Sequence, residues 1–184
     1  MRELPVGSAH QKPTEAPADH DGRRGFVVSQ MTRLEAVPVN PELQGRSYPP
    51  TPPYLVGREK VREFARAVLA TSPLHFEEEA ARAAGYADVV APPTFPIVVQ
   101  DATLQQLLAD EDAGIDFSRV VHGDQRFTYS RPIVAGDELT GTMTVTSVKS
   151  LAGNSMVTSE TVITDASGAH VVTATSSLVV RSAE

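Results

Sequence analysis

The chain has 184 residues, a formal net charge of -7 at pH 7 and no cysteine. This length suits one ordinary domain with a tail, and the acidic balance argues against binding to nucleic acid, which needs clustered Lys and Arg. The lack of cysteine excludes a disulfide framework or a thiolate metal site, and the five histidines are scattered rather than set at ligand spacing, so we expect no metal.

No apolar run approaches the roughly 20 residues that a membrane-spanning helix needs. The polar N-terminus also lacks the apolar core of a signal peptide. We therefore expect a soluble, cytoplasmic protein that does not contact a membrane.

The N-terminal region is rich in proline, with nine of the 14 prolines before Tyr54. Residues 1–30 show almost no apolar periodicity and are predicted to be a disordered extension, so that Met31 is an alternative to Met1 as the natural start. Residues 31–53 are predicted to form a Pro-rich arm, because "YPPTPP" favours extended backbone. The domain proper is expected over residues 54–184.

Two helices are predicted next. From residue 59 the apolar residues recur at helical spacing on one face, and Pro73 ends this helix. The apolar positions are Val61, Phe64, Ala65, Val68 and Leu69. The following "HFEEEAARAAG" predicts a short second helix with Gly85 as its stop.

A third helix is predicted from Thr94, as N-cap, to about residue 112. Its first two turns are almost wholly apolar, so it should be buried. From residue 124 onward the apolar period changes to two, which predicts antiparallel strands over 124–132, 138–150, 155–164 and 170–181. Asp165 to Gly168 suits a hairpin turn between the last two strands.

An apolar helix followed by consecutive antiparallel strands predicts an α+β domain with one sheet curled around a central helix, a description that fits the hot-dog fold. Four segments carry a more specific resemblance: "VGREKVREFARAV", "SPLHFEEEAARAAGYADVVAPPTFP", "VVHGDQRFTYSRPIVAGDELT" and "VKSLAGN". They resemble the MaoC-like, fatty-acid-synthase-type dehydratase and hydratase domains of actinobacteria, in particular the small subunits of mycobacterial type II (3R)-hydroxyacyl-ACP dehydratase. The resemblance covers about residues 40–181.

The catalytic signature of active relatives runs Asp-x-Asn-Pro-Leu-His, then five residues and Ala. Removal of water from a 3-hydroxyacyl thioester needs a base, an acid and a donor for the developing enolate oxygen. In this chain Pro73, Leu74 and His75 match the signature, and Ala81 stands at the expected distance. Ser72 replaces the Asn, and Ala70 replaces the catalytic Asp.

A second departure precedes the predicted central helix. Active hydratases carry a His-Gly pair there, whose glycine N-H points at the thioester oxygen. This chain has Ala91-Pro92-Pro93, and proline has no N-H to donate. The resemblance therefore implies that both the acid and the oxyanion site of the active enzymes are altered.

The resemblance also suggests site residues. His75 is the catalytic candidate, although a turn histidine that hydrogen-bonds the loop or caps the next helix is the simpler interpretation. Ala91, Thr94, Phe95 and Asp124 are the candidates for substrate binding.

Two further features each have two interpretations. Asp101 on the predicted central helix is either a catalytic carboxylate or, more simply, a polar residue at its solvent edge. The run His122 to Gln125 is interpreted as strand-entry structure, with a place at a dimer interface or acyl-channel wall as the alternative.

We expect an acyl-thioester-binding, non-catalytic or weakly catalytic subunit of a (3R)-3-hydroxyacyl-ACP or -CoA dehydratase, without a cofactor. The ligand would be acyl-ACP or acyl-CoA, and the partner a MaoC-like catalytic subunit with intact Asp and His, or a second copy of the chain. The alternatives are a self-sufficient homodimeric hydratase or thioesterase, and an acyl-binding regulatory module without chemistry.

Overall fold

The computed structural model describes residues 39–182. The predicted extension over residues 1–30 lies outside this range. The helices are α1 (Arg58–Ala67), α2 (Glu78–Ala83), α3 (Ile97–Ala109) and four short 3₁₀ turns, η1 (Pro41–Leu43), η2 (Pro73–His75), η3 (Glu111–Ala113) and η4 (Phe117–Arg119). The strands are β1 (Tyr54–Leu55), β2 (Val120–Tyr129), β3 (Glu138–Leu151), β4 (Asn154–Asp165) and β5 (His170–Val180).

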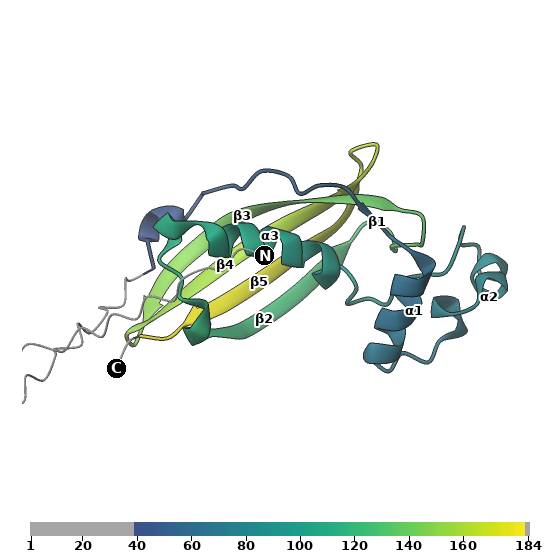
Figure 1. Cartoon of the computed structure of the whole chain (residues 1–184), viewed down its shortest axis with the longest axis horizontal. Helices are drawn as coiled ribbons and strands as arrows, with labels where there is room; N and C mark the ends of the chain where they lie inside the picture. Colours follow the sequence, from purple (N-terminus) through teal and green to yellow (C-terminus); the bar gives the residue numbers. More distant parts are fainter. Residues whose placement is uncertain (1–38, 183–184) are drawn as a thin grey trace, which may run out of the picture. The chain divides into compact units, whose positions relative to one another are not determined.

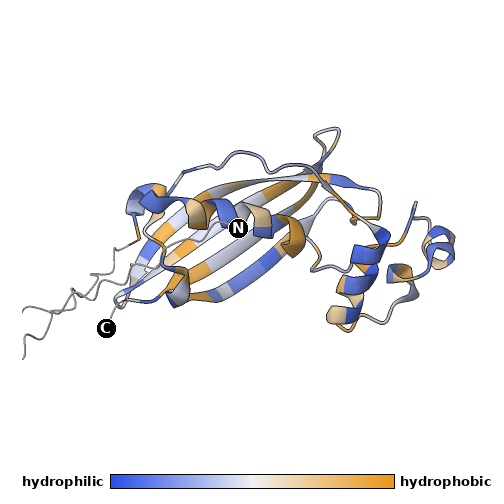
Figure 2. Cartoon of the chain, in the orientation of Figure 1, coloured by the Kyte–Doolittle hydropathy of each residue, from blue (hydrophilic) through white to orange (hydrophobic). Residues whose placement is uncertain are grey.

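The five strands form one antiparallel sheet in the order β1-β3-β4-β5-β2. The long helix α3 lies across one face of this sheet (Figure 1). The strands carry hydrophobic positions between paler or hydrophilic ones, as expected for a sheet with one covered face (Figure 2). This is the curled α+β architecture that the sequence predicts, and α3 is its central helix.

Close packing of α3 on β3 depends on Gly141. A Cβ atom at this position would lie 3.2 Å from Thr103 Cγ2 on α3, 3.3 Å from Thr161 Cγ2 on β4 and 3.4 Å from Val99 Cγ1. At these distances even a Cβ atom requires the neighbouring methyl groups to shift by a few tenths of an ångström, and a larger side chain would meet packed elements.

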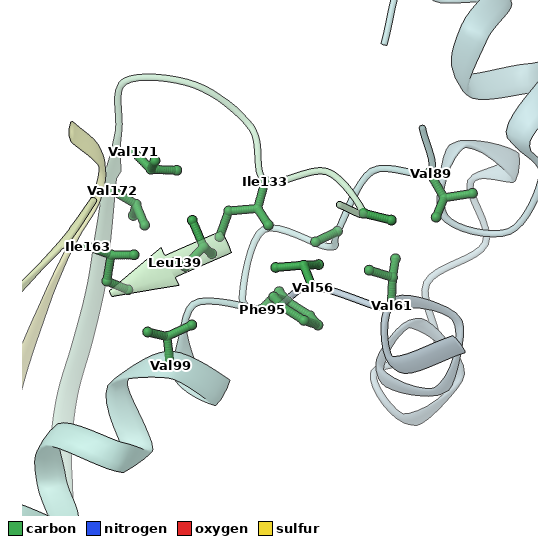
Figure 3. Packing of buried hydrophobic residues seen from close by; sticks show 12 residues of the cluster. Val56, Val61, Val89, Phe95, Val99, Ile133, Leu139, Ile163, Val171 and Val172 are labelled. Carbon is green, nitrogen blue, oxygen red and sulfur yellow. The ribbon is translucent and has the colours of Figure 1, made fainter. Parts of the chain in front are cut away.

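Two apolar clusters make up the core. The first joins α1, the start of α3 and the ends of β3, β4 and β5, and Figure 3 shows Phe95 between α3 and the side chains of Val56 and Val61. The Phe95 ring is fully buried and meets Phe64 edge to face at 5.3 Å between centroids. The second cluster includes Leu107 and gathers under the other end of α3.

The arm before β1 runs beside β3. Gly45 N donates to Val145 O and Thr51 N donates to Gly141 O, at 2.8 and 2.9 Å. Leu43 of η1 is fully buried in the second apolar cluster. The arm therefore contributes to the core over residues 39–53, while the division of the chain at residues 30 and 53 stays a prediction.

Asp110 holds the arm to the end of α3. Its Oδ2 accepts from Arg46 Nη1 at 2.6 Å and from the Tyr48 hydroxyl at 2.7 Å. The hydrogen bonds from Tyr48 and Arg46 lower the pKa of Asp110, and burial raises the pKa of Tyr48 to about 12.

Two helix boundaries differ from the prediction. Thr94 is not the N-cap of α3, because Phe95 and Ile97 first donate to the carbonyls of Pro92 and Thr94 in tight turns before the helix begins at Ile97. At the end of α1, Val68 and Leu69 leave the apolar face and are 45% and 84% exposed.

The exposure of Leu69 follows from its backbone conformation. Its φ of 56° is left-handed, and Ala70 N donates to Ala65 O, which closes the helix as a Schellman motif with leucine in the place where glycine is usual.

Within the described residues, no helix is long and apolar enough to cross a membrane.

Candidate functional site

The candidate site is built on the turn η2, which the local sequence specifies. Ser72 caps the turn by accepting from Leu74 N at 3.4 Å, and Pro73 supplies the fixed φ of its first position. His75 follows at the end of the turn. This segment is the "SPLH" part of the dehydratase-like signature.

Two further segments lie against η2. Val90 N donates to Leu74 O at 2.9 Å, and Ala91 N donates to Ile133 O at 2.8 Å. Val90 also forms a bridge with Val134. Three stretches that are distant in the sequence are thus tied side by side by backbone hydrogen bonds.

A pocket of about 400 Å³ opens where these stretches meet the end of β2. Its lining residues are Ser72, Leu74, His75, Val90, Ala91, Pro93, Tyr129, Ser130, Arg131, Pro132 and Ile133. Its size and largely apolar wall with a few polar groups are typical of a site for a small organic ligand.

His75 has a defined tautomer in this pocket. Its Nδ1 lies 2.6 Å from the carbonyl oxygen of Val90. A carbonyl oxygen can only accept, so Nδ1 carries the proton and Nε2 of the neutral ring is left with its lone pair. Nε2 has no hydrogen-bond partner in the part of the chain that the structure describes, and it is therefore free to accept a proton from a ligand.

The pocket contains no carboxylate to pair with His75: no Asp or Glu lines it within residues 39–182. Ala70, which stands at the Asp position of the signature, is half-buried just after α1, and its backbone N-H is taken by Ala65 O. The methyl side chain of alanine can act neither as a general acid nor as a general base. Among the described residues, the pocket therefore combines an imidazole with no carboxylate.

The backbone around the two prolines offers few donors for an oxyanion. Ala91 N donates to Ile133 O and Phe95 N donates to Pro92 O, while Pro92 and Pro93 have no N-H. The N-H groups of Ala91 and Phe95, on either side of the prolines, are therefore engaged with carbonyls, and the altered oxyanion site stays a prediction.

Tyr129 forms another wall of the pocket. Its hydroxyl donates to Pro93 O at 2.9 Å, and burial raises the pKa of Tyr129. The hydroxyl therefore stays protonated at neutral pH and acts as a donor. Because its proton points at Pro93, Tyr129 positions the loop before α3.

Arg131 lies on the pocket rim with its charge compensated. Its guanidinium donates to Asp137 Oδ2 at 2.8 Å and to Asp165 Oδ2 at 3.1 Å. These ion pairs hold the loop between β2 and β3 against the hairpin of β4 and β5. Arg131 is thus a structural member of the rim.

Ion pairs also hold the helical side of the site together. Arg58 on α1 donates to Asp88 at 2.6 to 3.0 Å and lies 3.2 Å from Glu78 on α2. The hydrogen bond from Arg58 lowers the pKa of Asp88. Arg62 of α1 also donates to the carbonyl of Phe76, directly after η2, so His75 is supported by α1.

The structure brings His75 and Ala91 together in the pocket. It places the other candidates for substrate binding elsewhere: Phe95 is in the core, Thr94 is exposed in the turn before α3, and Asp124 is exposed on β2. Asp101 is exposed on α3, where its carboxylate accepts from Gln105 at 3.5 Å. His122 donates from Nε2 to Asp124 O at 3.0 Å within the same strand.

Sequence reasoning missed Tyr129, Ser130 and Arg131 as pocket residues. In "RFTYSRP", half-buried Phe127 and Tyr129 alternate with exposed residues, and β2 ends before Pro132. A polar-tipped aromatic residue at such a strand end is a signal for a pocket wall.

Within the described residues, no group of three or more His, Asp or Glu side chains is placed to hold a metal ion.

Comparisons with known proteins agree with this architecture. The family profile described as "FAS1-like, dehydratase domain region" matches residues 42–174. The UPF0336 protein of Leifsonia xyli subsp. xyli is 76% identical over 148 residues, which cover 80% of this chain and 99% of that protein. The UPF0336 protein of Streptomyces avermitilis is 56% identical over 140 residues, 76% of this chain and 93% of that protein.

Solved structures of dehydratases and of a hydratase also match this chain. A chain of the C-terminally truncated HadBC complex, a 3R-hydroxyacyl-ACP dehydratase of Mycobacterium tuberculosis, matches with a TM-score of 0.66 and 35% identity over 74% of this chain and 96% of that chain. A MaoC-like dehydratase matches with a TM-score of 0.69 and 36% identity over 76% of this chain and 42% of that chain. The (R)-hydratase of A. caviae, at 18% identity and a TM-score of 0.55, shares the fold over 76% of this chain and 96% of its own.

The sheet curled around α3 and the pocket beside "SPLH" therefore define a hot-dog protein of the MaoC-like dehydratase and hydratase class. The chain belongs to the FAS1-like, dehydratase domain region family, and its curated relatives are UPF0336 proteins of actinobacteria. The predicted fold and family are both confirmed.

Proposed function

We propose that the chain is the acyl-thioester-binding, non-catalytic or weakly catalytic subunit of a (3R)-3-hydroxyacyl-ACP or -CoA dehydratase. One observation carries this proposal: the pocket holds His75 with a free Nε2 and, among residues 39–182, no carboxylate. The chemistry needs a proton taken from the carbon beside the thioester carbonyl and a proton given to the departing hydroxide. His75 can take one proton, and no carboxylic acid among the described residues of the pocket supplies the other.

A second chain can provide the complete acid-base pair. Among residues 39–182, the strand β2 is an edge of the sheet, bonded to β5 on one side only, and an unpaired edge is a surface for pairing with another chain. The HadBC and ChsH1-ChsH2 structures of Mycobacterium tuberculosis are complexes of two named components. We propose a MaoC-like partner that pairs along β2 and carries both catalytic side chains.

The experiment is co-expression with a MaoC-like chain of the same organism that carries the intact Asp and His, followed by a crotonyl-CoA hydration assay of the complex and of each chain alone. The proposal predicts a stable complex with more than about tenfold the activity of this chain alone, since one half of an acting pair supplies little of the rate. A chain that forms no complex and adds no activity would instead be a regulatory or acyl-binding module.

A self-sufficient hydratase is the second candidate, and the tautomer of His75 favours it, because a base with a free Nε2 is already positioned in the pocket. In that case the purified chain alone changes the absorbance of crotonyl-CoA, and His75→Ala abolishes the change. A hot-dog thioesterase would instead release free thiol from acyl-CoA in the same preparation.

A further inference from the structure

A second, smaller cavity lies between α3 and the sheet, away from His75. It has a volume of about 60 Å³, enough for a group of a few non-hydrogen atoms. It is lined by Ile97, Gln100, Leu104, His122, Gln125, Met143, Ser159, Ser176 and Leu178. Its exposed and half-buried members come from β2 and α3, so its mouth lies between these two elements.

The cavity wall carries buried amide groups that nothing in the described part of the chain bonds. Gln100 is only 4% exposed, and its Oε1 has no partner. Neither Oε1 nor Nε2 of Gln125 has a partner, although both atoms are buried. Proteins bond the large majority of such groups, because leaving one unbonded is costly. The floor adds two buried hydroxyls, Ser159 and Ser176.

This polar lining interrupts an otherwise apolar core. The cavity falls between the two apolar clusters, the first around Phe95 and the second around Leu107. The neighbouring buried threonines, Thr103 and Thr161, bond each other at 3.0 Å and need nothing further. Three of the four buried side-chain atoms that lack a partner among the described residues therefore line the cavity, and the fourth, Gln106 Oε1, lies outside it.

The strand β2 connects this cavity to the His75 pocket. Tyr129 lines the pocket, Gln125 lines the cavity, and Phe127 between them packs against the first apolar cluster. These alternate residues share one face of the strand, and four residues of strand span about 13 Å. An extended chain that ran from the pocket along β2 would pass Phe127 before it reached the buried amides.

We propose that the cavity binds a hydroxyl group at the distal end of the acyl chain, so that this subunit selects oxygen-bearing acyl thioesters over plain alkyl ones. The proposal rests on the proposed acyl-thioester binding. A hydroxyl donates to Gln100 Oε1 and accepts from Gln125 Nε2, and it bonds both amides in either orientation of their O and N atoms. An alkyl terminus leaves all three amide atoms unbonded.

The test is a calorimetric titration of the full chain, alone and in complex with its partner, with decanoyl-CoA and with ω-hydroxydecanoyl-CoA. We expect the hydroxylated ligand to bind about tenfold more tightly, the difference that one or two hydrogen bonds to buried groups produce. Gln100→Leu and Gln125→Leu should each remove this preference. Gln105→Leu, on the exposed side of α3, serves as the matched control and keeps the preference.

Equal affinity of the unmodified protein for the two ligands would overturn this inference, and the cavity would then hold only water. That comparison needs no variant, so a substitution that fails to fold does not weaken the test. If neither ligand binds, the proposed acyl-thioester binding fails as well. The failure of the selectivity alone is therefore distinguishable from the failure of the proposed function.

Discussion

At the level of single residues, the proposed function depends on His75 and Ala70. The bond from Nδ1 of His75 to Val90 O fixes the tautomer that a general base needs. Ala70, at the acid position of the signature, has only a methyl group. Under the proposed function, the pocket keeps the signature histidine and lacks the signature acid.

Ala70→Asp tests whether the missing acid is the main defect. Because position 70 is half-buried after α1, a carboxyl group can be placed there without entering the core. We expect crotonyl-CoA hydration by the chain alone to rise at least about tenfold, a modest share of what general acid catalysis contributes. Ala70→Asn is the matched control, and an equal effect of both substitutions would contradict the assignment of the acid position.

Asp165 gives a prediction for acid stability. Hydrogen bonds from Ser167 and Arg131 lower the pKa of Asp165 to about 2. A depressed carboxyl pKa stabilises the folded state above the ordinary Asp value, and this stabilisation is lost as the pH falls toward the folded-state pKa. Asp165→Asn cannot titrate, so its urea midpoint should fall less between about pH 6 and about pH 3 than that of the unmodified chain.

Asp101→Asn, on the exposed face of α3, is the control for that measurement. It should lose stability with falling pH as the unmodified chain does. An Asp165→Asn curve that parallels the unmodified chain would show that the turn at 165–168 plays no part in acid stability.

At the scale of elements, the fold depends on how closely α3 approaches the sheet. Gly141 makes room for Val99 and Thr103 of the helix. The two ends of α3 are buried in the two apolar clusters, with the polar cavity between them. Movement of α3 would therefore disturb the core and the cavity together.

Gly141→Val tests this packing. The added atoms would overlap side chains of α3 and β4, so we expect the free energy of unfolding to fall by about 1–3 kcal/mol. Thr142→Val, the next residue on β3, faces away from α3 and should change stability by less than about 0.5 kcal/mol. Chemical denaturation of both variants measures the difference, and equal stabilities would show that α3 has room to shift.

At the scale of the whole molecule, the sequence predicts the fold well because periodicity reports which face of each element is covered. The helices α2 and α3 and the strands β3, β4 and β5 appear within a few residues of their predicted bounds. The strand β2 also appears, but it begins at Val120 rather than at residue 124. The end of α1 escaped prediction, because Leu69 adopts a left-handed conformation that a helical pattern does not reveal.

The candidate site is only partly readable from the sequence. The "SPLH" motif identifies His75, but the pocket also needs segments around residues 90 and 130, which meet only through backbone hydrogen bonds. Gln100 and Gln125 are also hidden from a periodicity argument, since a polar residue in an amphipathic pattern is taken to face solvent.

The central claim is that this chain shapes the substrate site while its partner performs the proton transfers. The most direct test is the hydration rate of the co-purified complex after substitution of one histidine at a time. We predict that His75→Ala in this chain retains more than about half of kcat, whereas substitution of the partner's motif histidine lowers it by about a hundredfold or more. A comparable loss from His75→Ala would contradict the account and make this chain a catalytic subunit.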